Sequence, residues 1–211
     1  MDRRRDVKAT YDRIATHFAQ TREYPWPETE AFLADRHGET GLDIGCGNGR
    51  NAELLAAHTD RVIGLDLSDG LLEEATVHAR EREFAIELIQ GDASRLPIGA
   101  NRIELALYIA TIHHLPTRTA RRRSLDELDR VLANDGSALI SAWSVSHRKF
   151  DAETGFDTTV EWTLPDGETV DRFYHIYDLG EFETDLAAST LRVIDSYESE
   201  GNCYAIVETS G

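Results

Sequence analysis

The 211-residue sequence is poor in cysteine, and its two cysteines, Cys46 and Cys203, form no Cys-x-x-Cys pair. A zinc cage or a disulfide framework is therefore not predicted. The adjacent histidines His113 and His114 do not make a complete metal site, so we expect no metal. No run of 18 or more apolar residues is present, and the charged N-terminus has no apolar stretch behind it. We therefore expect neither a membrane span nor a secretory signal, and a cytoplasmic location.

Lysine is also scarce, because Lys8 and Lys149 are the only two among the 22 basic residues. The 39 acidic residues bring the net charge to −17. This acid excess with little lysine predicts a halophilic protein, in which salt screens self-repulsion; an acidic mesophilic protein is the alternative. At molar salt the Debye length is only about 3 Å. Net charge therefore neither favours nor excludes a nucleic-acid partner.

Short apolar runs alternate with helical stretches between residues 40 and 144, which indicates a parallel α/β sheet. We expect strands at residues 40–44, 61–67, 84–90, 102–109 and 137–143, and helices at 50–58, 69–81 and 118–132. Beyond Ser144 we expect a β-hairpin with strands at 161–164 and 170–173, then a helix at 179–189 and closing strands at 191–197 and 203–208. The prediction is one domain with a Rossmann-like, seven-stranded sheet, helices on both faces and a terminal antiparallel strand. Its expected segments are a helical N-terminal segment (1–37), the core of the sheet (38–144), an insertion with the hairpin (145–175), and the closing helix and strand pair (176–211).

The first 35 residues are expected to form two helices separated by Pro25-Trp26-Pro27. Proline disfavours a helical conformation for the residue before it, so the chain should be extended here. Two interpretations remain open. The segment either caps one face of the sheet or forms a lid over a cofactor pocket.

Three glycines, Gly45, Gly47 and Gly49, stand at alternate positions after the first strand. Glycine lets the backbone turn sharply and approach a ligand closely. A dinucleotide-binding loop would carry a further glycine where Arg50 stands, so the spacing favours a ligand without a pyrophosphate. Asp66 ends the second strand and can accept hydrogen bonds from ribose hydroxyls, and Asp92 ends the third and could accept one from an adenine amino group.

This combination of a glycine loop and two acids at successive strand ends resembles the class I S-adenosylmethionine (SAM) dependent methyltransferases. The resemblance implies SAM as the cofactor. It assigns nine residues to cofactor binding: Asp43, Gly45, Cys46, Gly47, Asp66, Leu67, Asp92, Ala93 and Ile109.

The edge expected to face the methyl group, residues 110–115, lacks the Asn/Asp-Pro-Pro-Tyr motif of enzymes that methylate exocyclic base amines. Neither cysteine is placed to act as the nucleophile that methylation of pyrimidine carbon 5 requires. These absences favour an oxygen nucleophile or a small activated carbon.

Several segments resemble the tRNA wobble-uridine 5-carboxymethyl methyltransferases. They are Tyr11-Asp12-x-Ile14-Ala15-x-His17-Phe18-x-x-Thr21-Arg22-x-x-Pro25-Trp26-Pro27, Ile112-His113-His114-Leu115, and Tyr197-x-x-x-Gly201-Asn202. The resemblance implies methyl esterification of a 5-carboxymethyl group on the wobble uridine. It places His113 and His114 at the acceptor pocket, with Arg22 holding the carboxylate or the methionine end of SAM. Tyr11, His17 and Trp26 would contact the substrate or close the lid. The insertion before Tyr174 is abbreviated and acidic compared with the family.

The helix at residues 118–132 carries the densest positive cluster, which includes Arg118, Arg121 and Arg122. These arginines could neutralise tRNA phosphates. Equally, they could pair with the acids of their own helix, Asp126, Glu127 and Asp129.

Members of the resembled family act as heterodimers with a small zinc-binding methyltransferase activator protein. The resemblance places the activator on the exposed third strand, residues 84–90, whose apolar side chains would otherwise be an aggregation liability. Two other functions remain open. A small-molecule methyltransferase of the quinone type would not need the Pro-Trp-Pro lid or the arginine helix, and a non-catalytic SAM-binding module would show no turnover.

Overall fold

The computed structural model describes residues 3–209 and contains a seven-stranded sheet of order β3-β2-β1-β4-β5-β9-β8. Its strands are β1 (Gly38–Ile44), β2 (Thr59–Asp66), β3 (Glu87–Gln90), β4 (Ile103–Tyr108), β5 (Leu132–Trp143), β8 (Arg192–Ser199) and β9 (Asn202–Glu208). β1 to β5 are parallel, and β9 is antiparallel to β5 and β8. The predicted fold class is confirmed.

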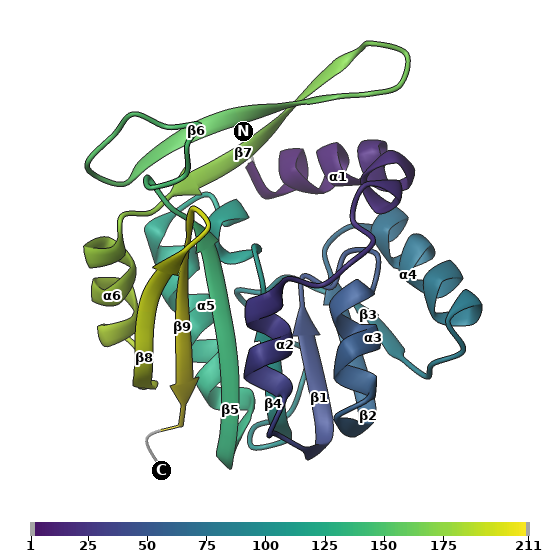
Figure 1. Ribbon diagram of the computed structural model, residues 1–211, viewed down its shortest axis with the longest axis vertical. Coiled ribbons are helices and arrows are strands. Elements are labelled where there is room, and N and C mark those ends of the chain that lie inside the picture. The colour runs from purple at the N-terminus through teal and green to yellow at the C-terminus, as the bar shows by residue number, and fades with distance from the viewer. Residues whose placement is uncertain (1–2, 210–211) are drawn as a thin grey trace.

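Helices cover both faces of this sheet (Figure 1). On one face, α2 (Pro27–Leu33) and α3 (Arg50–Ala56) pack against the apolar side chains of the central strands. On the other face, α5 (Arg118–Val131) and α6 (Leu179–Ala187) bury Leu125, Leu128 and Phe182. α4 (Asp69–Glu81) begins at the N-cap Ser68, whose hydroxyl accepts from the Leu71 amide. None of the helices within residues 3–209 combines the length and apolar character needed to cross a bilayer.

Two segments lie above the carboxyl ends of the parallel strands. They are α1 (Arg3–Gln20) and a separate hairpin of β6 (Phe156–Thr163) and β7 (Thr169–Ile176) (Figure 1). The hairpin strands are longer than expected from the sequence, and they turn where Gly167 adopts a left-handed φ of 87°. A short 3-10 turn, η1 (Ile112–His114), lies beneath them and contacts β7.

The third strand is shorter than predicted, because it begins at Glu87 and not at residue 84. Glu83 takes a left-handed φ of 56°, and the Phe84 amide donates to the Ala79 carbonyl as α4 ends. Phe84 and Ile86 then pack, partly buried, against the core on the α2/α3 face. The exposed apolar edge is therefore smaller than the sequence indicates.

Candidate active site

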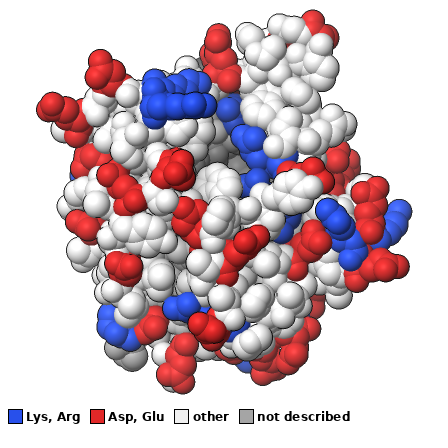
Figure 2. Space-filling model, in the orientation of Figure 1, with Lys and Arg blue, Asp and Glu red and all other residues white. Residues whose placement is uncertain are grey.

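A cleft opens at the carboxyl ends of β1, β2 and β4, under α1 and the β6–β7 hairpin. Its empty volume is about 1180 Å³ including the open mouth. Figure 2 shows this hollow, with Lys and Arg atoms along its wall, on a face otherwise dotted with acidic side chains. It is lined by thirteen of the predicted site residues: Tyr11, Arg22, Trp26, Gly45, Cys46, Gly47, Asp66, Leu67, Asp92, Ala93, Ile109, His113 and His114.

The glycine loop forms one wall of the cleft. Gly45 has a φ of 73°, and a Cβ there would lie 2.1 Å from the Thr111 hydroxyl, so the position requires glycine on both grounds. Gly47 also has a positive φ, of 54°, and an added Cβ would meet only Phe18 of α1, at 3.9 Å. The loop is therefore packed tightly at Gly45 and leaves open space at Gly47, where a ligand can approach the backbone.

Asp66 is fixed at the end of β2 by two backbone donors. Its Oδ2 accepts from the Gly47 amide and its Oδ1 from the Ser68 amide, both at 2.9 Å. Burial raises the pKa of its carboxyl, although these amide hydrogen bonds oppose the shift. Each carboxylate oxygen can accept a second hydrogen bond, which is what a ribose diol requires.

Asp92 follows β3 and carries three hydrogen bonds to its carboxylate. Oδ1 accepts from the Ser94 amide and hydroxyl, each at 2.8 Å, and Oδ2 pairs with Arg4 of α1 at 2.9 Å. Burial opposes ionisation, but the bonds from Ser94 and the Arg4 guanidinium outweigh it and lower the pKa of Asp92. The carboxylate is therefore a charged acceptor at neutral pH, and α1 already occupies one of its oxygens.

Asp43 lies behind the glycine loop and does not line the cleft. It is fully buried, and neither oxygen has a hydrogen-bond partner in the described part of the chain. Burial raises its pKa to about 7, with Arg50 opposing the shift. Direct contact with a cofactor therefore remains a prediction for this residue.

His113 lines the cleft from η1 and is 1% exposed. Its Nδ1 accepts from the Trp143 amide at 3.0 Å, which leaves the proton of the neutral ring on Nε2. Burial, together with the nearby His114 and Arg172, lowers its pKa well below the usual value. His113 is thus a neutral side chain held in one tautomer.

His114 has both ring nitrogens engaged. Nδ1 lies 2.9 Å from the Phe173 carbonyl and must donate to it, so Nε2, at 2.8 Å from the Tyr11 hydroxyl, accepts. Burial lowers the pKa of His114 to about 3. The histidine therefore joins α1, η1 and β7, and Tyr11 is the α1 residue in this contact.

Arg22 and Trp26 line the cleft from the segment between α1 and α2. The Arg22 guanidinium lies 5.3 Å from the Phe18 ring centroid, within cation–π range, and burial lowers its pKa. The Arg22 carbonyl accepts from the side chain of Asn48 at 2.9 Å, which ties the segment to the glycine loop. Arg22 is thus positioned to hold an anion in the cleft.

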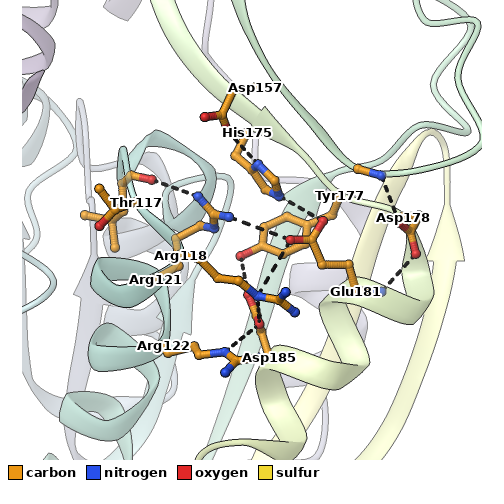
Figure 3. A network of polar contacts seen from close by, with 12 residues as sticks. Thr117, Arg118, Arg121, Arg122, Asp157, His175, Tyr177, Asp178, Glu181 and Asp185 are labelled. Carbon is orange, nitrogen blue, oxygen red and sulfur yellow. Dashed lines mark hydrogen bonds and ion pairs between the residues drawn. The ribbon is translucent and has the colours of Figure 1, made fainter.

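The predicted phosphate-binding arginines have partners on α6, not the acids of their own helix (Figure 3). The buried Asp185 accepts from Nε of Arg118 at 2.7 Å and of Arg122 at 2.8 Å. Arg121 is 3% exposed and lies 3.7 Å from Glu181, so its burial does not agree with a phosphate-binding role. Arg118 and Arg122 remain partly exposed, and for them a phosphate contact stays a prediction.

His17 also lies outside the cleft. Its Nδ1 accepts from the Trp162 indole N–H at 3.2 Å, so it packs α1 onto the β6–β7 hairpin. The hairpin in turn supplies two cleft residues that the sequence reasoning missed, Arg172 and Tyr174. The side chains of a strand alternate between its two faces, so Val170, Arg172 and Tyr174 share one face of β7, and this face is buried. Strand spacing could therefore have grouped Arg172 and Tyr174. Asn48, Arg50, Asn51 and Trp143 were missed as well.

The residues present fit SAM. Asp66 offers free lone pairs at one strand end, Asp92 a charged acceptor at the next, and Gly47 an open approach to the backbone. Among residues 3–209, no group of three or more histidine, cysteine or acidic side chains is arranged to hold a metal.

Comparison with known proteins agrees with this geometry. A family model described as a methyltransferase domain matches residues 42–140. A putative methyltransferase of Encephalitozoon cuniculi is 31% identical over 212 residues, covering 97% of this chain and 95% of that protein. The tRNA (carboxymethyluridine(34)-5-O)-methyltransferase of Saccharomyces cerevisiae is 36% identical over 165 residues, covering 75% of this chain and 57% of that enzyme.

Solved structures share the fold at low identity. The S-adenosylhomocysteine complex of DhpI has a TM-score of 0.74 at 19% identity, covering 98% of this chain and 96% of DhpI. A Haloferax volcanii putative methyltransferase, solved in complex with the Trm112 methyltransferase activator, has a TM-score of 0.72 at 14% identity, covering 97% and 98% of the two chains. The chain belongs to the class I SAM-dependent methyltransferases, and tRNA carboxymethyluridine methyltransferases are among the proteins that it resembles in sequence.

Proposed function

We propose that this tRNA methyltransferase esterifies the carboxylate of 5-carboxymethyluridine, or a close variant, at the anticodon wobble position. The observation that carries the proposal is the composition of the cleft. Asp66 at the end of β2 and Asp92 after β3, the proposed SAM-binding acids, line the same cleft as aromatic rings and arginines from α1 and β7. The names of the relatives support the same acceptor.

The aromatic rings suit a base removed from its stack. Trp143 and Tyr174 are stacked at 4.8 Å between ring centroids, and the Tyr174 ring lies 4.9 Å from His113. Enzymes that modify single nucleotides commonly hold the extruded base against aromatic side chains. Aromatic side chains therefore form the cleft wall on the acceptor side, where Trp143 and Tyr174 are held by stacking on each other.

A carboxylate acceptor also suits the protonation states. Bound SAM supplies a methyl group on a positively charged sulfur. With a carboxylate acceptor, the new O–C bond would form as the S–C electron pair remained on sulfur, so both charges would be neutralised and no proton transfer would be required. Since a carboxyl group has a pKa of about 4, it needs no general base at neutral pH. His113 would orient the acceptor as a neutral donor, and orientation is the main requirement of such a reaction.

The test is methyl transfer from labelled SAM into tRNA from a strain that lacks the corresponding gene, followed by mass spectrometry of the anticodon nucleosides. We expect the methyl ester of the carboxymethylated wobble uridine. Label appearing in a lipid extract and not in tRNA would instead favour the small-molecule alternative. No turnover with partner and tRNA present would favour a non-catalytic module.

We also propose that a small activator protein pairs with the β3 edge of the sheet. β3 pairs with β2 only, so the backbone groups along its other side are available to an added strand. The Trm112 complex of the Haloferax structural relative supports this partner. Co-expression and pull-down with the activator test the interaction. A chain that is stable and fully active alone would argue strongly against it.

A further inference from the structure

Within residues 3–209, Arg172 is a buried cation without an acidic partner. Its side chain projects from β7 into the cleft and is 4% exposed. Nη1 donates to the Tyr174 hydroxyl at 2.7 Å, while Nε has no hydrogen-bond partner. Burying a charge without a counter-charge is costly, so an isolated buried guanidinium suggests that a ligand completes the site.

A second arginine faces the same chamber. The guanidinium carbons of Arg172 and Arg22 lie 4.8 and 5.7 Å from the centroid of the Trp162 ring, so both cations rest on one aromatic side chain. Among the described residues, no carboxylate forms an ion pair with either of them. By contrast, Arg118 and Arg122 share the buried Asp185. Although the chain has 39 acidic residues, none in the described part forms an ion pair with Arg172 or Arg22.

Their positions differ along the cleft. The backbone carbonyl of Arg22 accepts from Asn48, so the main chain of this residue lies beside the glycine loop on the cofactor side. Arg172 is hydrogen-bonded to Tyr174, whose ring contacts both His113 and His114, so it lies on the acceptor side. Both guanidinium groups contact the Trp162 ring, so they lie close enough to act on neighbouring anions.

We propose that Arg172, held by Tyr174 on the insertion hairpin, binds the carboxylate of the acceptor and selects it over a neutral amide of the same shape. This inference rests on the proposed function and assigns its acceptor specificity to one residue. Arg22 remains for the carboxylate of the methionine end of SAM.

Charge distribution decides which kinetic constant Arg172 controls. The acceptor carboxylate carries its full negative charge when it binds and loses that charge as the O–CH3 bond forms. A cation beside it therefore stabilises the bound substrate at least as well as the transition state. Removing Arg172 should raise KM and leave kcat little changed, because an interaction of this kind supports binding rather than the chemical step.

The experiment uses the full chain, with its activator where needed, loaded with S-adenosylhomocysteine. The probes are anticodon stem-loop RNAs with either 5-carboxymethyluridine or 5-carbamoylmethyluridine at the wobble position. We expect wild-type protein to bind the carboxylate RNA about 10- to 100-fold more tightly, the range of a charge-assisted hydrogen bond. Arg172→Gln should reduce this preference to below about threefold. It should raise KM for methyl transfer by about the factor by which the preference falls, and leave S-adenosylhomocysteine affinity unchanged.

Arg148→Gln is the matched control, because it removes one positive charge from an exposed position of the insertion. It should keep the wild-type preference, which separates a local contact from a general loss of attraction for RNA. If Arg172→Gln does not fold, Arg172→Lys keeps the charge without the forked geometry and should show a reduced but measurable preference.

A folded Arg172 variant that binds S-adenosylhomocysteine and retains the wild-type preference would overturn the inference while leaving the proposed function standing. Wild-type protein that neither binds nor methylates the carboxylate RNA would overturn the proposed function, and the inference with it.

Discussion

The two halves of the cleft are built in different ways. The cofactor half comes from strand ends close together in sequence, between Gly45 and Ala93, and its polar groups are mainly backbone amides and two acids. The acceptor half joins α1, η1 and β7, which are far apart in the chain, through the Tyr11–His114–Phe173 hydrogen bonds. Its charged cleft residues include Arg172 of β7 and Lys8 of α1. The acids of the cofactor half thus complement a sulfonium, and Arg172 of the acceptor half complements a carboxylate.

The largest expected effect is on the cofactor half. Asp66→Ala removes the acceptor for the ribose hydroxyls and the partner of two loop amides. We expect SAM affinity to fall by at least about 100-fold in calorimetry, since several hydrogen bonds to a charged group are lost. Asp60→Ala, at the opposite end of β2, is the control and should bind normally. Normal binding by the Asp66 variant would contradict the assignment of the cofactor site.

The second largest expected effect is on stability, at the ion pairs between α5 and α6. Asp185→Asn removes the buried charge shared by Arg118 and Arg122, whose side chains are 46% and 39% exposed. Because solvent screens the arginines, we expect a loss of about 2–3 kcal/mol of unfolding free energy, less than for a wholly buried pair. Denaturant unfolding measures this loss. An Asp129→Asn variant of the neighbouring α5 helix should lose less.

The buried Asp43 should make stability depend on pH. Its folded pKa is raised to about 7 from 3.8, so its contribution to stability is complete below the unfolded pKa and is lost as pH rises through 7. From pH 5 to pH 8 this one group should lower the free energy of unfolding by about 2–3 kcal/mol. Asp43→Asn should therefore be more stable than wild type at pH 8, with a smaller difference at pH 5. Thermal melts that fall in parallel for both proteins would show that Asp43 is not responsible.

His113→Ala probes the acceptor half without disturbing the cofactor half. It removes the ring that accepts from the Trp143 amide and contacts Tyr174. We expect turnover to fall about 10-fold through loss of acceptor positioning, while calorimetry shows SAM affinity unchanged. A variant with weakened SAM binding and normal turnover at saturating SAM would show that His113 belongs to the cofactor half and not to the acceptor half.

The smallest expected effect is that of pH on the rate. The acceptor carboxylate is ionised above a pH of about 5, and the pKa of His114, lowered to about 3, keeps that ring neutral. We expect kcat to change by less than about threefold between pH 6 and 8, because no group that takes part titrates there. A rate that rises steadily with pH would indicate a hydroxyl acceptor that needs a general base.

Much of the cofactor half could be predicted from the sequence, because strand, glycine turn and terminal acid are consecutive in the chain. Gly45, Asp66 and Asp92 all line the cleft as expected. The late start of β3, at Glu87, was not predicted, because the left-handed Glu83 and the packing of Phe84 depend on how α4 ends.

The sequence by itself determined the parallel sheet, the open loop at Gly47 and the acids at the strand ends, because local periodicity and chain order fix all three. Only the tertiary structure decided which arginines keep an unpaired charge. Arg121 is buried against α6 and Arg118 is paired with Asp185, whereas Arg172 enters the cleft without an acid. Whether an arginine is paired depends on the carboxylates near it in space. Those carboxylates lie on segments distant in sequence, so the residues next to the arginine in the chain do not predict them.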